Sequence, residues 1–145
     1  METSPGYRIL PHTTDAYIES YGATLEEAFV QAGLALFDTM CNLDSVNCTT
    51  TEKIQLKATN ELTLLYDWLE KLLLKFELEE KVYAKFDPIK IERCEDGLTL
   101  EALLRGESYD RKRHGAKVEV KAVTFHKMEV LYPNDGVVLR FLLDL

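Results

Sequence analysis

Two stretches of the chain place apolar residues at the spacing of an amphipathic helix. The first begins at Thr24 and is expected to end near Cys41; its stripe is Leu25, Ala28, Phe29, Ala32, Leu36 and Met40. Thr24-Leu-Glu-Glu27 has the form of a capping box, in which hydroxyl and carboxylate satisfy free amides of the first turn. The second helix follows Asn60 as its N-cap, and its stripe is Leu65, Trp68, Leu69, Leu72, Leu73 and Phe76. Both stripes are expected to face the core.

Most of the remaining chain alternates apolar and polar residues with a period of two, which is typical of β-strands. Runs at 7–10, 16–21 and 53–58 precede or separate the helices. Later runs lie at 82–91, 98–104, 118–124, 128–132 and 138–144. Glu95-Asp-Gly97 and Asn134-Asp-Gly136 have the sequences of hairpin turns. The order β-α-β-α followed by a β-meander predicts an α+β fold, with two helices packed on one face of a mostly antiparallel sheet.

Length and composition indicate one domain covering residues 1–145. Apolar residues make up 46% of the 145 positions, which is enough for a full hydrophobic core. The formal net charge of −8 argues against a general nucleic-acid binder, because phosphate contacts require a basic surface. The cysteines are odd in number and have no Cys-x-x-Cys spacing, which favours reduced thiols and a cytoplasmic location. They are Cys41, Cys48 and Cys94.

No membrane association is expected. The N-terminus lacks a basic region followed by an apolar core, so a signal peptide is not predicted. The most apolar segment, 62–76, is interrupted by charged residues, which excludes it as a membrane span. These are Asp67, Glu70, Lys71 and Lys75.

One segment departs from the acidic balance of the chain. Between Arg105 and Lys127, seven Lys and Arg residues stand against three acidic residues. This basic loop contains Gly106 and Gly115 and is expected to continue as a strand from Val118. One interpretation is a solvated connection, since charge runs usually face water. The other is a contact surface for an anionic or acidic partner.

The end of the sequence gathers carboxylate oxygens. The last predicted strand places the α-carboxylate of Leu145 beside the side chain of Asp144. Asp15 lies in a polar turn after the first extended run and adds a third oxygen ligand if the first and last strands pair. Oxygen ligands of this kind suit a hard cation such as Ca²⁺ or Mg²⁺. From spacing alone, a solvated chain end is the alternative.

Other catalytic arrangements have little support in the sequence. His12, His114 and His126 share no ligand spacing, and a His-Glu-x-x-His motif is absent, which argues against zinc. Ser108 near His114 is the only local nucleophile–base pair, without a Gly-x-Ser-x-Gly turn. The glycines are scattered and form no phosphate-binding loop.

Several segments together resemble the archease family. They cover nearly the whole chain in the family's order, and although each is short, the set is specific. Phe125 stands where many members have Tyr, so no role is assigned to a hydroxyl there. The segments are His12-Thr-Thr-Asp15, Gly22-Ala-Thr-Leu-Glu-Glu-Ala-Phe29, Leu65-Tyr-Asp-Trp-Leu69, Gly106-Glu-Ser-Tyr-Asp110 with Arg113-His114, Lys121-Ala-Val-Thr-Phe-His126 and the terminal Leu143-Asp-Leu145.

The resemblance implies a protein cofactor and not an enzyme. Archeases assist the GTP-dependent RNA ligase that joins tRNA halves after intron removal in tRNA splicing. They promote guanylylation of the ligase's active-site histidine and let the ligase turn over repeatedly. The implied partner is this tRNA-splicing RNA ligase, with RNA contacted only indirectly through it and with no membrane involved.

The resemblance also implies a divalent metal ion as cofactor. Archeases are described as binding it through the Asp of the His-Thr-x-Asp turn, the Asp before the chain end and the terminal residue. These correspond here to Asp15, Asp144 and Leu145. Calcium and magnesium are the expected ions, with manganese as a third candidate.

Two surfaces are therefore expected to act on the ligase. The carboxylate corner holds a cation near the nucleotide, and the basic loop docks on the ligase or on phosphates held there. The residues expected to dock are Arg111, Arg113, His114 and Lys121, with Glu107 and Asp110 orienting the loop. Two other classes remain open. One is a small metal-dependent hydrolase with Asp15 and Asp144 as ligands and His114 or His126 as base; the other is a chaperone-like interaction module.

Overall fold

The two long helices lie where the apolar stripes predict them. The computed structural model describes residues 4–11 and 14–145, with α1 at Leu25–Met40 and α2 at Glu61–Glu79. Thr24 Oγ1 accepts a hydrogen bond from the Glu27 amide at 3.1 Å. Asn60 Oδ1 accepts one from the Thr63 amide at 2.8 Å. Both predicted N-caps are confirmed.

The strands form two antiparallel sheets. The four-stranded sheet has the order β1-β2-β7-β6, with β1 at Gly6–Leu10, β2 at Ala16–Gly22, β7 at Val137–Asp144 and β6 at Ala122–Leu131. The three-stranded sheet has the order β3-β5-β4, with β3 at Thr50–Ala58, β5 at Gly97–Ser108 and β4 at Lys81–Cys94. A 3₁₀ turn, η1 (Leu43–Ser45), and a short helix, α3 (Arg111–His114), lie in the connections.

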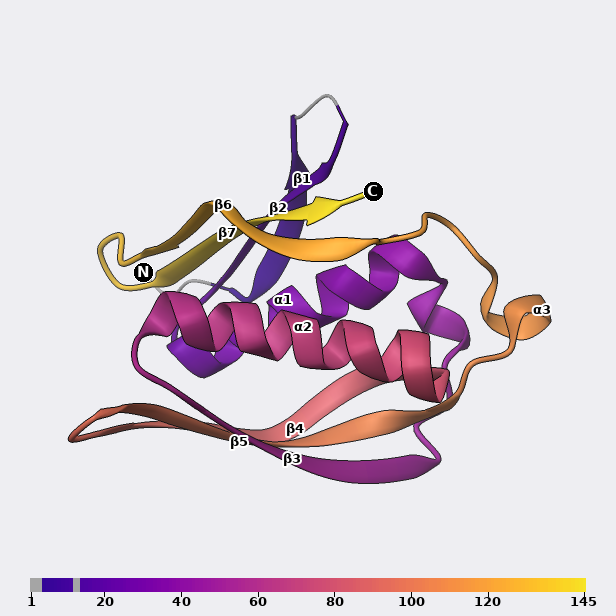
Figure 1. Ribbon diagram of the computed structural model, residues 1–145, viewed down its shortest axis with the longest axis horizontal. Helices are drawn as coiled ribbons and strands as arrows, with labels where there is room; N and C mark the ends of the chain where they lie inside the picture. Colours follow the sequence, from indigo (N-terminus) through magenta and orange to yellow (C-terminus); the bar gives the residue numbers. More distant parts are fainter. Residues whose placement is uncertain (1–3, 12–13) are drawn as a thin grey trace.

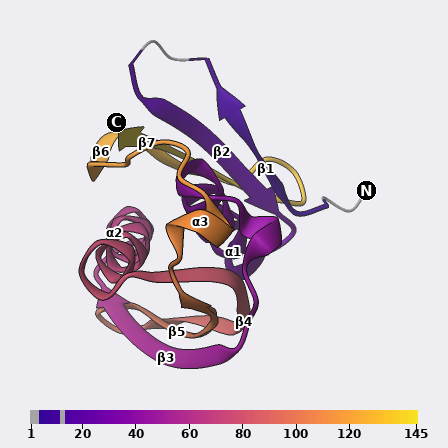
Figure 2. The ribbon, with the colours of Figure 1, turned by 90° about the vertical axis from the view of Figure 1, so that its right-hand side faces the viewer.

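The helices lie between the two sheets, as Figures 1 and 2 show from two directions. α1 packs against β2 and β4, and α2 packs against β6 and β3. The predicted α+β class is confirmed, but the expectation of one sheet with both helices on one face is wrong. The physical reason is that each helix is apolar on more than one side: in α1, the consecutive residues Ala35, Leu36 and Phe37 are all buried. A helix buried on two sides needs two covering layers.

Aromatic side chains fill the space between the helices and the three-stranded sheet. Trp68 of α2 is fully buried, and its indole donates to the Phe29 carbonyl of α1 at 2.9 Å. Its ring also meets that of Phe86 from β4 edge-on, with ring centres 5.3 Å apart. Trp68 therefore joins both helices to one sheet, and the prediction that it packs in the core is confirmed.

Two strand boundaries differ from the sequence prediction in the region of the basic loop. Residues 116–121, expected to be a strand from Val118, are irregular, because the amides of Lys117 and Val118 donate to Met40 and Thr39 at the end of α1. Residues 105–108, expected to be loop, belong to β5. Gly106 permits this, since a Cβ there would overlap the Val82 carbonyl of β4.

The structure also bears on the cysteines and on membrane association. All three cysteines are free thiols, with Cys41 buried in the core as expected and Cys48 and Cys94 exposed. In residues 4–11 and 14–145, no helix is long and apolar enough to cross a membrane.

We expect Trp68→Phe to lower the free energy of unfolding by about 2 kcal/mol, because it leaves a cavity and removes the bond to Phe29. Denaturant unfolding followed by circular dichroism measures this change. Leu78→Ala on the same helix is the control, since Leu78 is 76% exposed and its truncation should change stability little. Equal losses in the two variants would contradict the role given to Trp68.

Candidate functional site

The antiparallel pairing of β2 with β7 ends next to the residues of the predicted carboxylate corner. The corner consists of Asp15, Asp144 and Leu145. Ala16 pairs with Leu143 at the end of the β2–β7 ladder, so the next step of the same register places Asp15 opposite Asp144. Residues directly opposite in an antiparallel pair have Cβ atoms about 4.5–5.5 Å apart. Two carboxylates at this separation can share one cation.

The corner lies on the outer face of the four-stranded sheet. Leu143 is fully buried, and because side chains alternate between faces, Asp144 points away from the core and is exposed. β6 reaches the same place from the other side of β7, with Ala122 paired to Asp144. The amide of Lys121 donates to the Asp144 carbonyl at 2.7 Å. One residue of the basic loop therefore lies beside the corner.

The chemistry of these donors fits a hard divalent cation. Carboxylate and main-chain oxygens are the ligands that Ca²⁺ and Mg²⁺ prefer. In the part of the chain that the structure describes, no group of three or more His, Cys, Asp or Glu side chains is arranged to hold a metal ion. That the main-chain oxygens of Leu145 supply a third donor stays a prediction from the sequence. His12, in the same predicted turn as Asp15, lies outside the described residues.

Glu107 fixes the position of the basic loop. Its Oε1 lies 2.5 Å from Arg113 Nη2, and its Oε2 accepts from the Asn47 amide at 2.7 Å. The same Oε2 lies 2.8 Å from His114 Nε2. Asp110 caps α3 by accepting from the Lys112 amide at 3.0 Å. These contacts match the orienting role that the sequence analysis gives to both acids.

His114 is part of this anchor and not of a contact surface. Its side chain is 0% exposed, so the expectation that it docks on a partner does not hold in this structure. Its Nδ1 accepts from the Asp110 amide at 2.8 Å, which leaves Nε2 as the donor to Glu107 and makes the ring neutral. Both ring nitrogens are occupied, so His114 is also not positioned as the general base of a hydrolase.

The other proposed contact residues of the loop lie at the surface. Arg111 and Lys121 are exposed. Arg113 is 42% exposed and also donates to the Ser45 carbonyl at 3.3 Å. Ser108 is not paired with His114 as a nucleophile; its hydroxyl accepts from Lys81 Nζ at 3.3 Å. Arg111, Arg113 and Lys121 thus place guanidinium and ammonium groups on the outward surface of the loop.

The sequence patterns did not predict an ion-pair cluster around one buried carboxylate. Glu19 in the middle of β2 accepts from the Nε atoms of Arg8 and Arg140, each at 2.8 Å. Burial alone would raise the pKa of Glu19, but the two guanidinium groups outweigh burial and the pKa lies below its usual value. A charged residue inside a predicted strand was the only signal, and its partners on β1 and β7 could be found only from the strand order.

The structure defines a class of small α+β protein in which two antiparallel sheets enclose a pair of helices, with Asp15 directly before β2 and Asp144 as the last residue of β7. The chain belongs to the archease family, because the model of the archease protein family matches residues 7–145. A protein archease of Pyrococcus abyssi is 38% identical over 86% of this chain and 87% of its own length. One of Methanothermobacter thermautotrophicus is 36% identical over 97% of this chain and 99% of its own.

Solved structures agree with the family assignment. The solution structure of Methanobacterium thermoautotrophicum protein 1598 has a TM-score of 0.84 and 35% identity, covering 97% of this chain and 99% of its own. A crystal structure of a Thermotoga maritima archease, named a possible chaperone, has a TM-score of 0.63 and 16% identity, covering 95% of this chain and 96% of its own. At that identity the second structure shows the fold alone.

The anchor at Glu107 predicts a pH dependence of stability. The hydrogen bond from Arg113, followed by those from Asn47 and His114, outweighs burial and holds the pKa of Glu107 at about 2, below the ordinary 4.5. Because the folded-state pKa is the lower one, this stabilisation is present above pH 4.5 and is lost as the pH falls toward 2.

We therefore expect Glu107→Gln to be less stable than the wild type near pH 6, and the difference to shrink as the pH falls toward 2. Urea unfolding across this pH range measures both free energies. Glu119→Gln, at an exposed position, is the matched control. If the loss of unfolding free energy in Glu107→Gln did not change with pH, the low pKa of Glu107 would be contradicted.

Proposed function

We propose that this archease is a non-enzymatic protein cofactor of the GTP-dependent RNA ligase of tRNA splicing. It promotes guanylylation of the ligase and allows multiple turnover. Membership of the archease family supports the proposal, together with one observation: β2 and β7 pair as far as Ala16 and Leu143, the residues next to Asp15 and Asp144. An activator needs a surface that it can present to another protein, and Asp144 is exposed on the outer face of a sheet.

The carboxylate corner is the acting surface in this proposal. Asp15, Asp144 and Leu145 supply oxygen ligands for a divalent cation, with calcium, magnesium or manganese as the candidates. When bound, such a cation supplies positive charge that neutralises nucleotide phosphates. In this proposal, the β2–β7 ladder, which ends at Ala16 and Leu143, keeps the neighbouring Asp15 and Asp144 close together before the partner arrives.

The basic loop is the docking surface in this proposal. Arg111 and Lys121 are exposed, and Arg113 is fixed by Glu107 while keeping part of its guanidinium accessible. Since the Lys121 amide is bonded to Asp144, docking at the loop would position the corner as well. RNA is contacted only through the ligase, in keeping with the net charge of −8.

We expect Asp15→Asn and Asp144→Asn each to reduce the stimulation of ligase guanylylation by about tenfold or more, because each removes a charged ligand. Guanylylation of the ligase from the same source is measured with labelled GTP, with and without divalent metal. Calorimetric titration of the isolated variants with Ca²⁺, Mg²⁺ and Mn²⁺ gives an independent readout of metal binding.

Glu77→Gln, exposed on α2, is the matched control and should stimulate the ligase like the wild type. Thermal unfolding checks that all variants fold. Full stimulation by both Asp variants would refute the role of the corner. Phosphoester hydrolysis by the protein alone, or suppression of aggregation of unrelated proteins that survives Asp144→Asn, would favour the hydrolase or the chaperone instead.

Charge reversal in the basic loop tests docking. Arg111→Glu and Lys121→Glu should weaken ligase binding by about tenfold or more and make the remaining binding less sensitive to salt, since surface charge steers association. Their thermal stability should stay unchanged, because neither side chain belongs to the Glu107 anchor. Lys71→Glu on α2 is the control with the same change of charge. Equal weakening by all three would show that only the net charge matters.

A further inference from the structure

The outer face of the three-stranded sheet carries an excess of positive charge. On a strand, side chains alternate between faces. Those of β3, β5 and β4 that point away from the helices include five bases and three acids. We call the five bases, Lys53, Lys57, Lys85, Lys90 and Arg105, the basic sheet face; the acids are Asp87, Glu92 and Glu101. This local excess contrasts with the net charge of −8 for the whole chain.

Three of these bases are not matched by carboxylates. Lys57 pairs with Asp96 at 3.2 Å and Lys90 with Glu92 at 2.7 Å. For Lys53, Lys85 and Arg105, the described residues provide no carboxylate within ion-pair distance. The Arg105 Nε donates instead to the main-chain carbonyl of Asp87 at 3.0 Å.

Two of the three unmatched bases face each other. Lys85 of β4 is the register partner of Arg105 of β5, and like charges directly opposite in an antiparallel pair are destabilising. Lys53 is the register partner of Leu103, the residue two before Arg105 on the same face. An anion placed among these three side chains would offset the repulsion between Lys85 and Arg105. It would also pair with Lys53.

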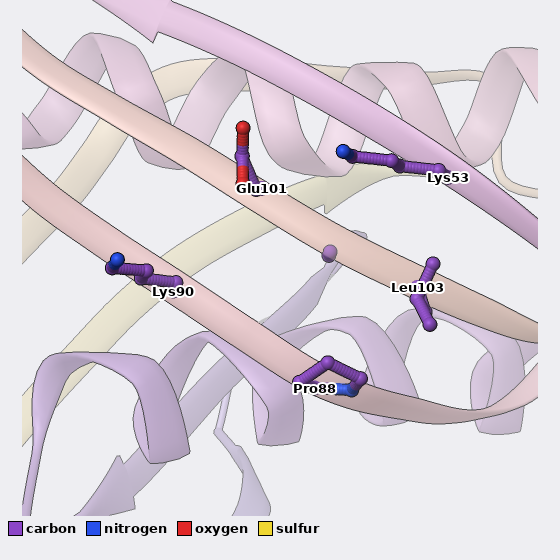
Figure 3. Close-up of a pocket in the computed structure, with 6 residues that line it drawn as sticks. Lys53, Pro88, Lys90, Glu101 and Leu103 are labelled. Carbon is purple, nitrogen blue, oxygen red and sulfur yellow. The ribbon is translucent and has the colours of Figure 1, made fainter.

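A β-bulge opens a hollow next to this cluster. Between the pairs Phe86–Leu104 and Ile89–Ala102, β4 has two residues, Asp87 and Pro88, where β5 has only Leu103. Such bulges disrupt the ladder locally and recur next to functional sites. The result is a shallow hollow of about 300 Å³. Figure 3 shows its lining: Lys53, Pro88, Lys90, Glu101, Ala102 and Leu103.

We propose that the basic sheet face binds an extended, acidic segment of a partner polypeptide. One apolar side chain of that segment occupies the hollow against Pro88 and Leu103. Flanking carboxylates pair with Lys53, Lys85 and Arg105. Apolar anchors within a charged rim are the usual anatomy of such contacts.

The lining of this face favours an acidic peptide over a nucleic-acid strand. Single-stranded nucleic acids bind sheets through aromatic side chains on which bases stack, and the outward positions of β3, β5 and β4 carry no aromatic ring in their paired registers. Glu101 also lines the hollow, held by a 2.7 Å hydrogen bond from Gln55, and its carboxylate would repel a phosphate chain. A peptide can place its apolar residue there instead.

This surface is separate from the carboxylate corner assigned to ligase activation and shares only Arg105 with the basic loop. The helices lie between the three-stranded sheet and the sheet that ends in the carboxylate corner (Figure 1). The inference therefore goes beyond the proposed function, and loss of peptide binding need not change guanylylation. The two proposals can fail independently.

The test uses the full chain labelled with ¹⁵N and a short capped peptide of Asp and Glu residues with one central Leu. We expect amide shifts to change around Lys53, Lys85 and Leu103 and to leave the carboxylate corner unchanged. Lys53→Glu combined with Lys85→Glu should weaken peptide binding by about tenfold or more, measured by fluorescence anisotropy at low salt. The control pair, Lys71→Glu with Lys112→Glu, changes the net charge equally at exposed positions of α2 and α3.

Two further probes complete the design: the same peptide with Ser in place of Leu, and an oligouridylate of equal net charge. Weaker binding of both than of the Leu peptide would support the inference. The inference would be overturned if both charge-reversed pairs lost the same peptide affinity, or if the Ser peptide bound as tightly as the Leu peptide. It would also be overturned if the oligouridylate shifted the same amides and bound at least as tightly as the Leu peptide. The same conclusion would follow if the Leu peptide changed amide shifts of the wild-type protein only outside the three-stranded sheet.

Discussion

The pairing of β2 with β7 is the contact on which the four-stranded sheet depends. It joins strands whose residues lie more than a hundred positions apart, as in the Glu19–Arg140 ion pair, which spans 121 positions. β1 attaches to one side of this pair and β6 to the other. The pairing covers one side of α1 and ends at Ala16 and Leu143, next to Asp15 and Asp144. The layer that closes the core and the proposed site therefore depend on the same register.

Glu107 has a comparable role for the basic loop. A loop rich in Lys and Arg repels itself, and one buried carboxylate that binds Arg113, His114 and the Asn47 amide offsets that repulsion. Gly106, immediately before it, lets β5 approach β4 closely enough to place the carboxylate there. Consequently, the anchored loop holds its remaining basic side chains at fixed positions on the surface. In this way an acidic residue maintains a basic surface.

Local patterns in the sequence predicted the elements well, because helix spacing, N-caps and Asp-Gly turns are set by near neighbours. They did not predict that α1 and α2 would be covered on two sides, since the division of strands between sheets depends on distant pairings. The same limit explains His114: its place in a basic segment suggested exposure, whereas it is buried with Glu107 and Asp110 as its partners. For the corner, Asp15 and Asp144 could be paired from sequence only by assuming that the first and last strands meet. The hollow beside Leu103 depends on a bulge at Asp87 and Pro88 that a break in alternation signals but does not locate.

The β2–β7 pairing also has a consequence for how the protein is made. β2 is synthesised early, yet its partner β7 follows more than a hundred residues later, so the four-stranded sheet cannot close before then. The strands β3, β4 and β5 and both helices are available before that point and can assemble first. Until β7 arrives, β2 has one unpaired edge and its apolar face against α1 is incomplete, a state in which nascent chains are prone to self-association. The high contact order of this closure is also expected to make it a slow step of folding.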